Sequence, residues 1–137
     1  MNHPELQQAF ETVDEQIRGY EIAVNAGEQP DLAGLVEHAG QLVKKLMVAY
    51  IQDVGEAAPP GPDDDLLESF KILVKGDPSW NTIRDNCREL VYYQNCLSMD
   101  RADALPVQPH KMAVRTLRHI FLFMKTRCMR ESRLEMA

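Results

Sequence analysis

The sequence predicts an all-α protein, a single-domain helical bundle of about five helices over residues 1–137. Two antiparallel hairpins are expected, joined by a Pro-rich linker and a short helix. Apolar residues recur at intervals of three and four along most of the chain, and no stretch of useful length alternates as a strand would. The prolines stand between these stretches or at their starts, and the chain length suits one hydrophobic core.

The first two helices form an N-terminal hairpin. The first is expected from about Pro4 to Ala26, with a seam of apolar residues at spacings of four and three. The seam comprises Leu6, Phe10, Val13, Ile17, Tyr20 and Val24. The second helix opens at 29–31 and runs to about Val54, and such a short connection makes the pair antiparallel. Because the hairpin is acidic and heptad-patterned, it is also the surface through which a homodimer would form.

A Pro-rich linker at 55–65 follows the hairpin. Its three prolines cannot continue a helix, and it ends in three aspartates at 63–65. We interpret this acidic run as favourable charge at the start of a short third helix, from Asp65 to about Lys75. A metal ion or a basic partner is the alternative ligand of the run.

Two longer helices complete the chain. The fourth is expected from Pro78 to about Asp100, and a second short linker follows at 101–109. The apolar seam of the fourth helix includes Trp80, Ile83, Cys87, Leu90 and Leu97. The fifth helix is expected from about His110 to Leu134. Its core-facing stripe comprises Val114, Leu117, Phe121, Met124 and Cys128, with Ala113 and Ile120 alongside.

A second stripe of the fifth helix is basic and carries two large apolar residues. It comprises Lys111, Arg115, Arg118, Leu122, Lys125 and Met129. Residues 1–103 carry a net charge of −11 and residues 104–137 a net charge of +5. The stripe therefore either pairs with acidic helices of its own bundle or faces an acidic or amphipathic protein partner. Since Leu122 and Met129 would expose apolar area unless covered, we predict that all six residues bind a partner.

The sequence argues against most enzyme chemistry and against a bound metal or cofactor. The seven glycines form no phosphate-binding loop, and the histidines and cysteines lack metal-ligand spacing. Three unclustered cysteines indicate reduced thiols and a cytoplasmic protein. No apolar run approaches the length of a membrane span, so no membrane partner is expected. Nucleic-acid binding is not expected of so acidic a chain, and the fifth helix is the only segment that could reverse this locally.

Two stretches partly resemble families with histidine chemistry. Residues 38–42, His-Ala-Gly-Gln-Leu, resemble the His-x-x-Lys-Gly core of histidine phosphotransfer domains, with glutamine and leucine in the last two positions. The pair Arg115 and His119 resembles the Arg–His motif of HEPN-type nucleases, with three intervening residues where that family has four to six. The first resemblance implies His38 as a phosphoacceptor, and the second implies His119 as a nuclease residue.

The predicted function is a non-catalytic, protein-binding helical bundle that uses the basic and apolar face of its C-terminal helix. An adaptor, a secretion-type chaperone or a regulator would have this character. The alternatives are a histidine-dependent phosphotransfer or nuclease-like protein, or a nucleic-acid binder using the same helix. A His38 buried in apolar contacts would argue against phosphotransfer, and a His119 with no carboxylate or cleft nearby would argue against nuclease chemistry.

Overall fold

The computed structural model describes residues 3–135, and every regular element within them is helical, which confirms the predicted all-α bundle. The α-helices are α1 (Pro4–Asn25), α2 (Leu32–Val54), α3 (Leu66–Gly76), α4 (Arg84–Ser98) and α5 (Pro109–Arg130). Two 3₁₀ turns precede the last two helices, η1 (Pro78–Ile83) and η2 (Ala102–Ala104). None of these described helices has the length and apolar character needed to cross a membrane.

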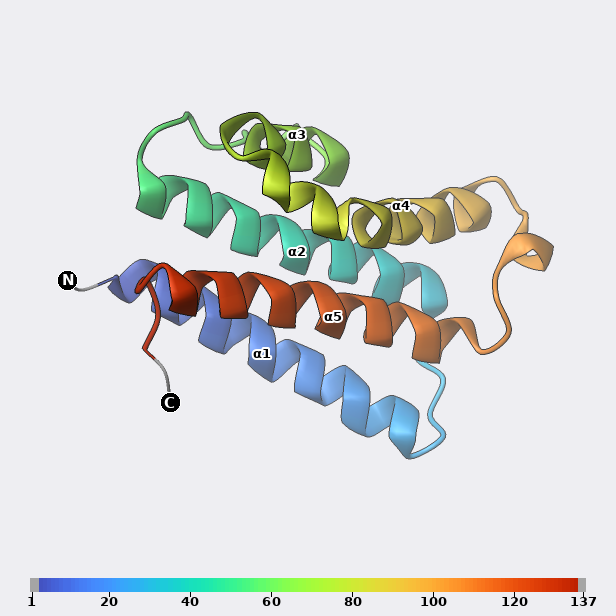
Figure 1. The fold of residues 1–137 in the computed structure, drawn as a ribbon. Helices are drawn as coiled ribbons and strands as arrows, with labels where there is room; N and C mark the ends of the chain where they lie inside the picture. The colour runs from blue at the N-terminus through green and yellow to red at the C-terminus, as the bar shows by residue number, and fades with distance from the viewer. Residues whose placement is uncertain (1–2, 136–137) are drawn as a thin grey trace.

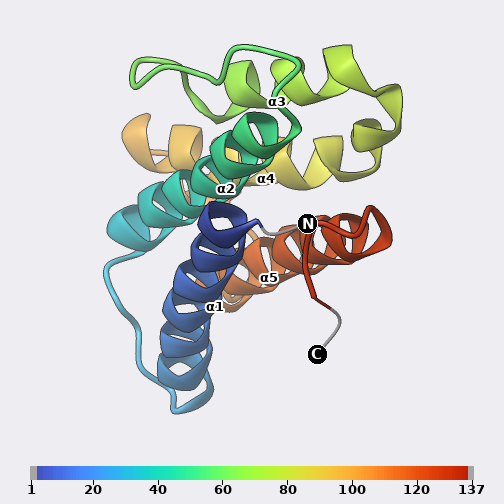
Figure 2. The ribbon, with the colours of Figure 1, turned by 90° about the vertical axis from the view of Figure 1, so that its left-hand side faces the viewer.

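α2 is the central helix and packs against each of the other four α-helices. α1, α2 and α5 contact one another, and α3 and α4 cover the opposite side of α2 (Figures 1 and 2). A helix with so many neighbours must be apolar over much of its circumference, and α2 meets this requirement. Its buried residues are Leu35, Val36, Ala39, Leu42, Val43, Leu46, Met47, Tyr50 and Ile51.

The predicted apolar stripes of α1 and α5 face the core. Leu6, Phe10, Val13 and Ile17 of α1 are all buried, and the seven core-facing residues expected on α5 are buried as well. The α1 seam is therefore used inside the bundle. A homodimer through the N-terminal hairpin stays a prediction, and the apolar residues that would hold it are covered by the chain's own helices.

Aspartate caps fix the starts of α2, α3 and η1. The side chains of Asp31, Asp65 and Asp77 accept hydrogen bonds from backbone N–H groups two or three residues further along. Asp65 thus has the capping role predicted for the acidic run. The chain between α2 and α3 contains no helix, and Lys44 of α2 holds it by donating to the carbonyl oxygens of Gly61 (2.8 Å) and Asp64.

The fourth and fifth helices differ from the prediction at their ends. η1 replaces the first turns of the predicted fourth helix, and α4 itself begins only at Arg84. Residues three apart lie on one side of a 3₁₀ helix, so both Trp80 and Ile83 point into the core. α5 ends at Arg130 rather than near Leu134, because Ser132 takes a left-handed conformation (φ 60°) and turns the chain back. Leu134 is then buried against the bundle.

Candidate functional site

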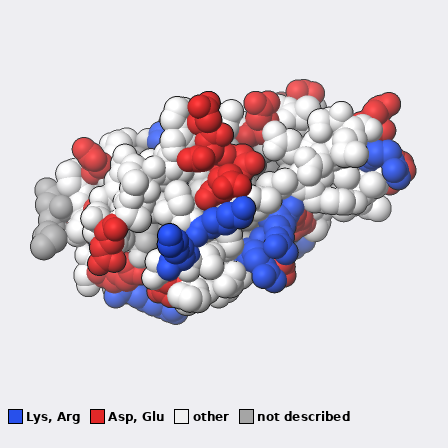
Figure 3. Space-filling model, turned by 90° about the horizontal axis from the view of Figure 1, so that it is seen from above, with Lys and Arg blue, Asp and Glu red and all other residues white. Residues whose placement is uncertain are grey.

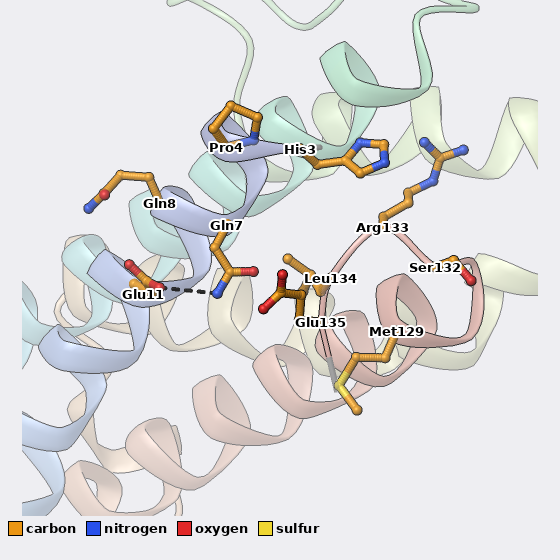
Figure 4. Close-up of a pocket in the computed structure, with 10 residues that line it drawn as sticks. All are labelled: His3, Pro4, Gln7, Gln8, Glu11, Met129, Ser132, Arg133, Leu134 and Glu135. Carbon is orange, nitrogen blue, oxygen red and sulfur yellow. Dashed lines mark hydrogen bonds between the residues drawn. The ribbon is translucent and has the colours of Figure 1, made fainter. Parts of the chain in front are cut away.

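The predicted partner-binding stripe of α5 lies beside α1, and both of its ends line hollows that the two helices share. Lys111, Arg115 and Arg118 line a hollow of about 210 Å³ together with Glu21 and neighbouring residues of α1. Met129 lines a larger pocket, of about 490 Å³, at the other end. Figure 4 shows this second pocket between the first turns of α1 and the chain that follows α5.

Arg118 is the member of the stripe that pairs inside the bundle. Its guanidinium donates to Asp14 (2.7 Å) and to both carboxylate oxygens of Glu21 (2.7 and 3.2 Å). It also lies 5.0 Å from the centre of the Phe121 ring, and its side chain is only 18% exposed. Burial acts to lower the pKa of Arg118, but the hydrogen bonds that it donates to Glu21 and Asp14 outweigh burial and raise the pKa. Arg118 therefore joins α5 to α1.

The other five members of the stripe have different surroundings. Lys111 and Arg115 are exposed, and neither forms an ion pair with any carboxylate of residues 3–135. Leu122 is 50% exposed. Lys125 is half-buried and likewise lacks an ion pair within that range, whereas Met129 packs against the core. The charge pairing considered for the whole stripe thus occurs at Arg118 alone.

Replacing Arg118 with alanine is expected to lower the free energy of unfolding by about 1–2 kcal/mol, since two half-buried carboxylates lose their partner. Arg115→Ala is the matched control, because Arg115 is exposed on the same helix, and its effect is expected to stay within about 0.5 kcal/mol. Urea denaturation followed by Trp80 fluorescence measures both. Equal effects of the two substitutions would contradict the role of Arg118 as a link between helices.

A second charged cluster, which no pattern in the sequence predicted, surrounds Arg127 near the end of α5. The guanidinium of Arg127 lies 4.0 Å from the centre of the Trp80 ring. It donates to the Asp77 carboxylate, to the Ser79 hydroxyl (2.7 Å) and to Glu131 (3.0 Å). Arg127 therefore connects α5 to the turn between α3 and η1, and its planar group covers the aromatic ring.

Glu131 links this cluster to α2. It accepts hydrogen bonds from the Tyr50 hydroxyl (2.8 and 2.9 Å) and from Arg133 (2.8 Å), and Arg133 also donates to Asp53 (2.8 Å). Burial acts to raise the pKa of Glu131, but hydrogen bonds from Arg133, Tyr50 and Arg127 outweigh it and lower the pKa. Burial, together with the hydrogen bond that its hydroxyl donates to Glu131, raises the pKa of Tyr50 to about 12. These contacts hold the segment after α5 against α2.

The histidines and cysteines considered for chemistry occupy different places. His38 is half-buried, and its Nδ1 shares a hydrogen bond with the Tyr20 hydroxyl. His119 is exposed and makes no hydrogen bond or ion pair within the described part of the chain. Burial raises the pKa values of Cys87 and Cys128 to about 12, so both are protonated thiols at neutral pH, and all three cysteines are free. Residues 3–135 contain no group of three or more His, Cys, Asp or Glu placed to hold a metal ion.

A third feature is a groove of about 360 Å³ between α3 and the η1–α4 segment, hereafter the α3–α4 groove. Apolar side chains of α3 form its floor, and four cations line its edges. The cations are Lys71, Lys75, Arg84 and Arg88. They are half of the eight Lys and Arg residues in positions 1–103, so cations gather here as well as on the fifth helix. The available signal was that each pair is spaced i, i+4 and therefore shares a helix face.

Figure 3 looks onto the side of the molecule that carries α3 and α4 and shows Lys and Arg side chains gathered there, next to a group of acidic ones. The α5 stripe, the Arg127–Glu131 cluster and the α3–α4 groove are thus three separate features, of which the sequence predicted the first. Comparisons with protein-family models, with curated proteins and with solved structures find nothing that matches this chain.

Proposed function

We propose that this chain is a non-catalytic, cytoplasmic protein-binding bundle, in the manner of an adaptor, secretion-type chaperone or regulator. Its contact surface is the exposed part of the α5 stripe, and its partner presents an acidic, partly apolar surface. The observation that supports this most is Leu122, which leaves half of its area exposed on a helix whose other large apolar side chains are buried or half-buried.

The surroundings of Leu122 define what would cover it. Arg115 lies two turns before Leu122 and Lys125 one turn after it, and neither is paired with a carboxylate of the described residues. Covering Leu122 removes apolar area from water, while the cations attract acidic groups and orient the partner. Arginine beside an apolar anchor is also a common composition of protein interfaces.

The geometry gives less support to the alternatives. One ring nitrogen of His38 shares a hydrogen bond with the Tyr20 hydroxyl. His119 is exposed and has no carboxylate partner among residues 3–135. Nucleic-acid binding by α5 would gain from exposed aromatic rings, but Phe121 is buried and Phe123 is half-buried against the core. A protein partner therefore fits the exposed part of this helix best.

The test compares two triple variants that make the same chemical change at different places. Lys111→Glu/Arg115→Glu/Leu122→Ala alters the α5 surface, whereas Lys45→Glu/Arg130→Glu/Ile22→Ala alters exposed residues elsewhere. Proteins captured from source cells are identified by quantitative mass spectrometry, and each candidate is then titrated against the purified chain. The α5 variant is expected to bind at least about tenfold more weakly than the control variant.

Circular dichroism of both variants checks that the helices persist. If the folded α5 variant kept every partner at unchanged affinity, the proposed contact surface would be wrong.

A further inference from the structure

We propose that the α3–α4 groove is a docking site for an acidic amphipathic helix of a partner protein. The groove shares no residue with the α5 stripe, so it is a second surface beyond the function proposed above. Its floor is formed by Leu67, Phe70 and Val74 of α3. Lysines from α3 and arginines from α4 line the same groove, so positive charge borders an apolar floor.

The cations come from two helices in matching pairs. Lys71 and Lys75 lie one turn apart on α3, and Arg84 and Arg88 lie one turn apart on α4. These side chains form few ion pairs within the bundle. Lys71 contacts Glu68 (3.2 Å) at the exposed surface, and Arg84 contacts its neighbour Asp85 at 3.7 Å. Lys75 and Arg88 have no carboxylate within ion-pair distance in the described range, so both remain available to a ligand.

An acidic amphipathic helix supplies what this groove lacks. Apolar side chains at i, i+3 and i+4 would cover the floor, and carboxylates on the flanks of the same helix would meet the lysines and arginines. A groove of about 360 Å³ lies at the low end of the size range of ligand sites, which suits the side chains of one or two helical turns. The charge complementarity is local, because the chain as a whole carries −6.

Two other classes of ligand fit less well. Nucleic acid would need exposed aromatic faces for stacking, but the one aromatic residue of the groove, Phe70, is buried. An anionic membrane would also meet the carboxylates of Glu68 and Asp85, which contact Lys71 and Arg84, and would be repelled by them. A short helix can contact the groove and avoid those side chains.

The test uses the full chain and a labelled synthetic helical peptide of about 20 residues, with leucines at i, i+3, i+4 and i+7 and glutamates on both flanks. Fluorescence anisotropy measures affinity, and amide chemical shifts map the site. Shifts are expected over residues 67–75 and 84–88. A peptide with glutamine in place of every glutamate, and the protein variant Lys75→Glu/Arg88→Glu, are each expected to weaken binding at least about tenfold. Raising the salt concentration should weaken it as well.

The matched control is Lys45→Glu/Arg130→Glu, which makes the same charge change at exposed positions outside the groove and should keep the peptide affinity. Equal binding of the glutamate and glutamine peptides, shifts confined to α5, or no binding at all would overturn the proposal. Stronger binding to anionic lipid vesicles or to single-stranded DNA than to the peptide would do the same. The α5 variant Lys111→Glu/Arg115→Glu/Leu122→Ala is tested separately, against captured partner proteins. A negative result for the α3–α4 groove is therefore distinguishable from a negative result for the α5 stripe.

Discussion

Replacing Trp80 with alanine is expected to lower the free energy of unfolding by about 3–5 kcal/mol. Trp80 is 1% exposed and fills the junction of α2, η1 and α5. Its ring lies 5.0 Å from that of Tyr50 and 5.9 Å from that of Phe123, centre to centre, and both pairs are close to edge-on. Arg127 covers the ring, so the substitution leaves a cavity and also removes the surface on which this guanidinium rests.

Urea denaturation followed by far-UV circular dichroism measures this loss, because Trp80 is the only tryptophan and its fluorescence disappears with it. Trp80→Phe is the matched control. It keeps an aromatic ring against Tyr50 and Phe123 and should cost clearly less than the alanine variant. A loss below about 1 kcal/mol for Trp80→Ala, the size of an average substitution, would show that the junction does not depend on this side chain.

Replacing Arg127 with alanine is the second change with a large expected effect, about 2–3 kcal/mol at neutral pH. The Arg127 side chain is 16% exposed and has contacts with Asp77, Glu131 and Trp80. Asp77 is 48% exposed, so solvent screening reduces its share, and most of the loss comes from Glu131 and the aromatic contact. Arg130→Ala, an exposed arginine of the same helix, is the control and should change little.

The size of this effect should depend on pH. Hydrogen bonds from Ser79, and then from Arg127, lower the pKa of Asp77 to about 2, and the pKa of Glu131 is lowered too. A carboxylate whose folded pKa is depressed stabilises the fold above its unfolded pKa, and that stabilisation is lost as pH falls through the folded value. The difference in the free energy of unfolding between wild type and Arg127→Ala should therefore become smaller as the pH falls from about 5 towards 2. Urea denaturation at several pH values measures it, and a difference that stays constant would contradict the pairing.

The sequence predicted the helices and the core because both depend on local spacing. The recurrence of Leu6, Phe10, Val13 and Ile17 determines which face of α1 is buried, whichever helix covers it. Helix ends were predicted less well. Pro78 indicated the start of a helix correctly, but its first turns are 3₁₀, and within them Trp80 packs against Tyr50, 30 positions earlier in the chain, a contact that local spacing does not reveal.

The candidate sites depend on how the helices pack against one another, which the spacing of residues in the sequence does not reveal. Arg118 and Glu21 are 97 positions apart, and the sequence offers many acids that could have been the partner. In the α3–α4 groove, each cation pair is recognisable from its i, i+4 spacing, but their meeting at one groove follows from how α3 and α4 pack. Leu122 was predicted to lie within a basic stripe, and the structure adds which cations around it are already paired.

The packing of α5 also has a consequence for how the chain folds during synthesis. α5 contacts α1, α2 and α4, yet it is the last of these helices to leave the ribosome. Until it arrives, the nascent chain displays the apolar surfaces that Leu117, Ile120, Phe121 and Met124 will cover. At about 5–20 residues per second, the 22 residues of α5 take a few seconds to be made. The growing polypeptide must remain unaggregated through that interval, because the bundle can close only after α5 has been made.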